Sequence, residues 1–125
     1  MTTTTLFGLA LAPLYAAIAQ VESDNGKTSD NIYQLRVLYV HDCNRITSNR
    51  YDFRESDRYV RWMSERMMYE YWKFYGGMYE SSVGKMPTYE VLARMHNGGP
   101  DGWFKKDTLP YWWKVKKVME AMSND

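Results

Sequence analysis

Cysteine and histidine are nearly absent from this chain of 125 residues. Cys43 is the single cysteine, so no disulfide can form within the chain, and with only two histidines a structural zinc site is not expected. Neither positive nor negative charge is in large excess, because the net charge is only +1. These shortages exclude a fold held by internal disulfides or by a structural zinc ion. The small net charge excludes a protein that binds polyanions by charge alone.

A hydrophobic run long enough to span a bilayer is also missing. The longest apolar stretch, Leu6 to Ala19, has 14 residues and is interrupted by Pro13. Ala17-Ile18-Ala19 has the small residues of a signal-peptide cleavage site, but residues 1–5 carry no Lys or Arg, so the basic start of such a peptide is lacking. We expect this stretch to begin the folded domain, without membrane insertion.

Apolar residues are plentiful, at 45% of the chain with 16% aromatic, which excludes a disordered protein. They recur at helical spacing, which predicts an all-α fold of about five helices in one compact domain over residues 1–125. The predicted helices run from Pro13 to about Val21, within 32–46, from about Val60 to Phe74, from about Pro87 to Met95, and from about Thr108 to Met122. Residues 33–40 could also form a strand.

Local signals predict where some of these helices begin and end. Asp24-Asn25-Gly26 should stop the first helix. Ser56 or Asp57 should cap the start of the third, and Gly76-Gly77 should end it. Along the third helix, the predicted buried stripe is Val60, Met63, Met67, Tyr71 and Phe74; along the last it is Leu109, Trp112, Val115, Met119 and Met122.

Glu22 is the first candidate for chemistry. It follows Leu14 and Ile18 at helical spacing and so shares their apolar face, at the helix end. A carboxylic acid placed there is expected to be partly desolvated, which favours its neutral form and suits a general acid. The competing interpretation is a solvated, inert Glu in the last turn of a surface helix.

The turn from Met95 to Pro100 is a second candidate. Gly98 and Gly99 would let backbone approach a ligand, with one of them at positive φ or where a Cβ would clash, and Asn97 offers a donor and an acceptor to a sugar. The competing interpretation is a plain helix stop. Five lysines between positions 105 and 117 would suit an anionic polymer, which keeps a nucleic-acid-binding helical domain as a less favoured function.

Read in order, these segments resemble motifs of the lysozyme-like superfamily. The motifs are Val21-Glu22-Ser23, Tyr33-Gln34-Leu35, the string ARMHNGGP from Ala93 to Pro100, and Thr108 followed by Tyr111-Trp112-Trp113-Lys114-Val115. Lytic transglycosylases carry a comparable order of motifs, and the closer similarity is to invertebrate-type lysozymes and their cysteine-poor bacterial and phage relatives. The similarity covers about residues 14 to 118, and the eight-residue string is its most specific part.

The resemblance implies a peptidoglycan-degrading glycosidase that cleaves the β-1,4 bond between N-acetylmuramic acid and N-acetylglucosamine, without metal or other cofactor. In that case Glu22 would protonate the glycosidic oxygen. Residues that would bind the sugar or orient the acid are Ser23, Tyr33, Gln34, His96, Asn97, Gly98 and Tyr111. The partner would be the glycan strands of the cell wall. By analogy with phage lysins, the protein would be phage-encoded and released at lysis or carried in the virion.

One departure from the family affects the mechanism. Gln34 follows Glu22 by only 12 positions, whereas the relatives have a longer, Gly-rich loop that supplies a second carboxylate. Asp30 is the possible second carboxylate here, and Asp24 is better explained as a helix stop. We therefore expect a mechanism that depends on Glu22 alone, as in a transglycosylase. The alternative is a catalytically inactive module on the same fold, serving as a phage structural or wall-binding component.

Overall fold

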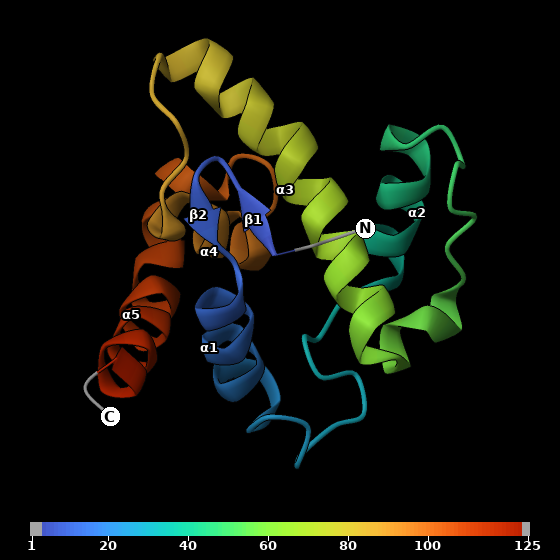
Figure 1. Cartoon of the computed structure of the whole chain (residues 1–125), viewed down its shortest axis with the longest axis horizontal. Coiled ribbons are helices and arrows are strands. Elements are labelled where there is room, and N and C mark those ends of the chain that lie inside the picture. Colours follow the sequence, from blue (N-terminus) through green and yellow to red (C-terminus); the bar gives the residue numbers. More distant parts are fainter. Residues whose placement is uncertain (1–3, 124–125) are drawn as a thin grey trace.

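Five α-helices and one short β-hairpin form the main regular structure of residues 4–123, the part of the chain that the computed structural model describes (Figure 1). The all-α prediction is therefore correct. The helices are α1 (Ala12–Ser23), α2 (Val37–Ile46), α3 (Arg61–Val83), α4 (Tyr89–Gly98) and α5 (Leu109–Ser123). The hairpin pairs β1 (Thr5–Leu6) with β2 (Leu9–Ala10). The short 3₁₀ helices are η1 (Glu55–Tyr59), η2 (Gly102–Phe104) and η3 (Lys106–Thr108).

The apolar stretch near the N-terminus builds part of the core. Leu14, Ala17 and Ile18 are fully buried on one face of α1, as the spacing predicted. The helix begins with Pro13 in its first turn and ends where Asp24 and Asn25 adopt left-handed backbone with φ of 51° and 56°. This end of α1 places Glu22 in the last turn, beside the loop that leads to α2.

The hairpin before α1 was not predicted from the sequence. Its two-residue turn, Phe7-Gly8, has φ of 52° and 77°, the doubly positive pattern of the tight turns that suit twisted hairpins. The ring of Phe7 lies against Gly76 in α3: a Cβ at Gly76 would be 2.5 Å from Phe7. Gly76 therefore provides the space in which the hairpin docks.

The predicted end of α3 at Gly76-Gly77 is wrong. The helix does not stop at Gly76-Gly77 but continues to Val83, where Gly84 caps it at φ 80°. Its start is also different, because Ser56 and Asp57 lie in η1 and Val60 is the N-cap. The buried face includes Met67, Met68, Tyr71, Trp72 and Tyr75, whereas Val60 and Phe74 are exposed. Val60 is the N-cap and precedes the helix, and Phe74 lies outside the buried stripe, which follows helical spacing through residues 64, 67/68, 71/72 and 75/76.

The segment before α2 is neither of the two predicted structures. Helix begins only at Val37, and residues 32–36 form no strand. Asn31 explains this, because its side chain accepts a hydrogen bond from the backbone N–H of Leu35 at 3.0 Å and donates one to the Leu35 carbonyl at 2.8 Å. Gln34 inside this loop has a left-handed φ of 54°. The Asn31 side chain thus bonds the backbone N–H and carbonyl of Leu35, so these residues form a closed turn in place of helix.

Helix α4 lies between α1, α3 and α5 in Figure 1, and its residues 91–95 are all buried. Arg94 is buried there and donates hydrogen bonds to Thr108 Oγ1 and to the Lys105 carbonyl, both at 2.8 Å. These bonds join the end of α4 to the start of α5. Of the stripe predicted for α5 only Val115 is fully buried, and Met122 is exposed because it lies in the last turn of the helix.

Candidate functional site

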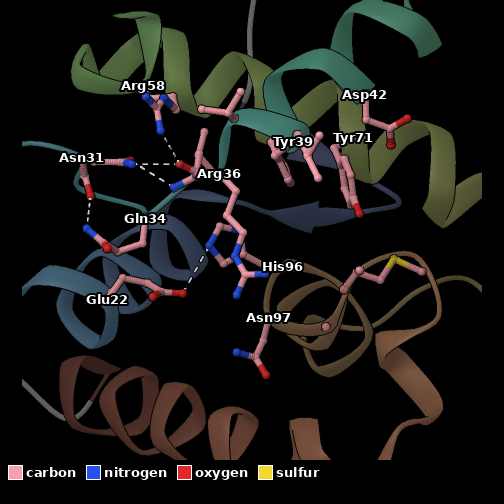
Figure 2. Close-up of a pocket in the computed structure, with 16 residues that line it drawn as sticks. Glu22, Asn31, Gln34, Arg36, Tyr39, Asp42, Arg58, Tyr71, His96 and Asn97 are labelled. Atoms are coloured by element: carbon pink, nitrogen blue, oxygen red, sulfur yellow. Dashed lines mark hydrogen bonds and ion pairs between the residues drawn. The ribbon is translucent and has the colours of Figure 1, made fainter. Parts of the chain in front are cut away.

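A groove of about 1110 Å³ lies between the 31–36 loop with the start of α2 on one side and the end of α4 on the other (Figure 2). The residues that line it are Glu22, Asn31, Gln34, Leu35, Arg36, Val37, Leu38, Tyr39, Asp42, Arg58, Tyr71, Met95, His96, Asn97, Gly98 and Gly99. Five of the residues predicted from sequence motifs, Glu22, Gln34, His96, Asn97 and Gly98, are thus brought to one cavity from three separate segments.

Glu22 lies at the base of this groove with its side chain one-fifth exposed, at 20%. Its Oε2 accepts a hydrogen bond of 2.9 Å from the hydroxyl of Tyr111, which reaches it from α5. Burial and the adjacent charge of Glu22 raise the pKa of Tyr111 well above its usual value, so the phenol stays protonated and able to donate. Within residues 4–123, Oε1 of Glu22 has no protein partner, which leaves one carboxyl oxygen for a substrate.

His96 fixes the same carboxylate from α4. Its Nε2 lies 2.9 Å from the carbonyl oxygen of Tyr33 and 3.4 Å from Oε2 of Glu22. A carbonyl oxygen can only accept, so Nε2 carries the hydrogen and donates it to Tyr33, with Oε2 of Glu22 close to the same nitrogen. The imidazole is 3% exposed, with the ring of Tyr111 stacked beside it at 6.4 Å between centroids. Oε2 of Glu22 is therefore hydrogen-bonded by Tyr111 from α5 and lies beside His96 of α4.

Ser23 and Tyr33 are buried and build the site without reaching it. Ser23 Oγ donates to the Ile32 carbonyl at 2.7 Å and accepts from the Gly26 N–H at 2.8 Å, which ties the loop to α1. The Tyr33 side chain points to the other side of the loop, where its hydroxyl bonds Glu65. Both residues are at most 1% exposed and neither lines this groove, so their role in binding the sugar or orienting the acid stays a prediction.

Gln34 and Asp30 occupy the loop differently. Gln34 lines the groove and its Nε2 donates to the Asn31 carbonyl at 2.7 Å, so backbone supplies one of its polar partners. Asp30 is exposed and does not line the groove. The structure thus gives no support for Asp30 as a second carboxylate. The second acid that does line the groove is Asp42 on α2, which the sequence motifs did not indicate.

Asp42 is already engaged by neighbouring side chains. Tyr75 donates a hydrogen bond of 2.6 Å to its Oδ2, and Arg45 donates two to its Oδ1 at 2.9 and 2.6 Å. Both carboxyl oxygens therefore have partners, in contrast to Glu22. Tyr39 and Tyr71, also missed from the sequence, stack beside Asp42 with ring centroids 4.3 Å apart and form a wall of the groove (Figure 2). Nothing in their helical spacing distinguishes them from core aromatics.

The glycine turn at the end of α4 has both predicted properties. Gly99 has φ 87° and ψ −171°, a backbone region that is essentially restricted to glycine. At Gly98 a Cβ would lie 2.5 Å from Thr108 Cγ2, so the turn packs directly on the start of α5. This packing aligns Asn97, which is exposed in the groove, with the helix that carries Tyr111.

Within residues 4–123 there is no cluster of three His, Cys, Asp or Glu side chains able to hold a metal ion, and no helix there is both long and apolar enough to cross a membrane. No protein-family model matches the sequence, and no curated protein matches it.

Proposed function

We propose that this protein is a peptidoglycan-degrading glycosidase with Glu22 as its general acid. The observation that carries the proposal is the convergence on one carboxylate: Tyr111 and His96, nominated from separate motifs, both contact Oε2 of Glu22 at the base of a groove. A groove of about 1110 Å³ is of the size that holds small ligands or a few sugar units. The competing view of Glu22 as an inert surface residue does not account for these contacts.

The chemistry of the proposal follows from the two oxygens of Glu22. Oε2 accepts a hydrogen bond from Tyr111 and lies beside His96, and Oε1 remains for the glycosidic oxygen of a bound glycan. Protonation of that oxygen by a positioned carboxylic acid makes the sugar a better leaving group and contributes about 10²–10⁴-fold to the rate. Asn97 and Gln34 line the groove with amide groups that suit the hydroxyl and acetamido groups of the substrate.

A mechanism with a single carboxylate fits the acids of this groove. A two-carboxylate glycosidase needs its acids about 5–5.5 Å apart when it retains configuration, or about 6.5–9.5 Å when it inverts. Here Asp30 lies outside the groove lining, and Asp42 has both oxygens bonded to Arg45 and Tyr75. We therefore propose that Glu22 acts first as acid and then as base, with a hydroxyl of the substrate as the nucleophile, which yields anhydro sugars.

Purified peptidoglycan tests the proposal. The wild-type protein is expected to release soluble muramyl fragments that mass spectrometry identifies, and Glu22→Gln is expected to lower that release by at least 10²-fold with an unchanged or higher thermal midpoint. Glu120→Gln, at an exposed position on α5, is the matched control. A Glu22→Gln variant with a third of wild-type activity would overturn the assignment. Binding to peptidoglycan without any release of fragments would favour the inactive, wall-binding module.

A further inference from the structure

Two guanidinium groups line the groove without an anionic partner. Arg36 precedes α2, and its exposed side chain points into the groove (Figure 2). Within residues 4–123 it makes no side-chain hydrogen bond or ion pair. Arg58 in η1 also lines the groove, and its guanidinium donates to two backbone carbonyls, Glu55 at 2.8 Å and Leu35 at 3.3 Å. The positive charge of both residues is therefore not neutralised by a carboxylate in the described part of the chain.

Three acidic side chains near these cations already contact other groups. Glu55 faces His41 at 3.2 Å, the Asp57 carboxylate accepts the Arg54 N–H at 2.8 Å, and Asp42 is bonded by Arg45 and Tyr75. The groove is thus lined by the cations of Arg36 and Arg58 and by one carboxylate with a free oxygen, Glu22. A neutral glycan such as a chitin oligosaccharide would leave these cations unused.

We infer that Arg36 binds a carboxylate carried by the substrate and thereby selects anionic glycans over neutral ones. The inference rests on the proposed function and specifies its substrate class: a strand whose muramic acid carries a free lactyl carboxylate. Guanidinium groups suit this role because their planar N–H donors match the two oxygens of a carboxylate. Arg58 is held in place by its two carbonyl contacts, and Arg36 is free to close on the ligand.

Binding to the Glu22→Gln variant tests this without any turnover. The probes are the N-acetylglucosaminyl–N-acetylmuramic acid disaccharide with its free lactyl carboxylate, and the methyl ester of the same disaccharide, each titrated by NMR. We expect the acid to bind about tenfold more tightly than the ester, the scale of one charge-assisted contact at an exposed site. We expect 0.5 M salt to reduce the difference, because exposed charges are screened.

Arg36→Gln in the same background is expected to remove the preference, so that acid and ester bind with similar affinity. Lys117→Gln, an equal charge change on exposed α5, is expected to keep the preference. Equal binding of acid and ester, no binding of either, or an unchanged preference in Arg36→Gln would overturn the inference. If the preference is found but wild-type protein releases nothing from peptidoglycan, the proposed cleavage fails and this carboxylate site stands.

Discussion

The hydroxyl of Tyr111 donates a hydrogen bond of 2.9 Å to Oε2 of Glu22, 89 positions earlier in the chain. This bond joins α5 to the last turn of α1 and fixes the carboxylate that we propose as the acid. The phenol of Tyr111 keeps its proton and donates it in a hydrogen bond to the Glu22 carboxylate. Glu22 in turn lines the groove. Tyr111 is therefore a positioning residue, and its role can be separated from that of Glu22.

Tyr111→Phe is expected to lower kcat for peptidoglycan cleavage about tenfold and to change KM little, because it removes one hydrogen bond to a charged group and no contact with substrate. The thermal midpoint should fall only slightly, since the ring still packs against His96. Steady-state kinetics on soluble muramyl oligosaccharides measure this split. Tyr79→Phe, at a partly buried position on α3, is the control; a rise in KM alone in Tyr111→Phe would contradict the positioning role.

The glycine turn at the end of α4 should separate stability from activity. Gly99→Ala is expected to cost about 1–3 kcal/mol of unfolding free energy, because alanine is strained at φ 87°. Asn97→Ala, exposed on the adjacent groove wall, is expected to reduce turnover with little change in stability. Urea denaturation and activity assays on both variants check this. Equal stability losses would mean that the turn serves only to end the helix.

Asp30→Asn is expected to keep most of the activity of the wild-type protein, because Asp30 is exposed and outside the groove lining. The products should then be anhydro-muramyl fragments, which mass spectrometry distinguishes from reducing-end products by the mass of one water. A loss of 100-fold or more, about 2.7 kcal/mol of activation free energy, together with reducing-end products, would show a two-carboxylate lysozyme instead.

Alkaline pH should destabilise the fold through Tyr75. Burial and the hydrogen bond to Asp42 raise the pKa of Tyr75 to about 12, above the ordinary value of 10.0 that applies in the unfolded chain. The folded protein therefore keeps a proton that the unfolded chain releases, and the free energy of unfolding should fall as pH rises from 10 to 12. One such group contributes at most about 1.4 kcal/mol per pH unit.

Tyr75→Phe checks the assignment, because it removes the titrating group and should make that decline with pH less steep. Denaturant unfolding between pH 8 and 12, compared with the wild-type protein, gives the slope. Identical slopes for the two proteins would show that Tyr75 is not linked to folding.

Local sequence signals determined the helices, the stop after α1 and the glycine turn, because periodic burial and turn chemistry act over a few neighbouring residues. They also nominated Glu22, His96, Asn97 and Tyr111, since their motifs lie within such short segments. Predictions failed where a residue contacts a distant part of the chain. The sequence predicts a helix stop at Gly76, but in the structure this glycine lies inside α3 and makes room for the ring of Phe7.

Only the tertiary structure decided how the groove is built. Which acids remain available depends on partners such as Tyr75 for Asp42 and Tyr111 for Glu22, 33 and 89 positions away. The same holds for Arg36 and Arg58. Their positions in the sequence do not show that they line a cavity, or that no carboxylate in the described residues pairs with them. Burial and charge pairing across the groove arise from long-range packing, and no short stretch of sequence encodes them by itself.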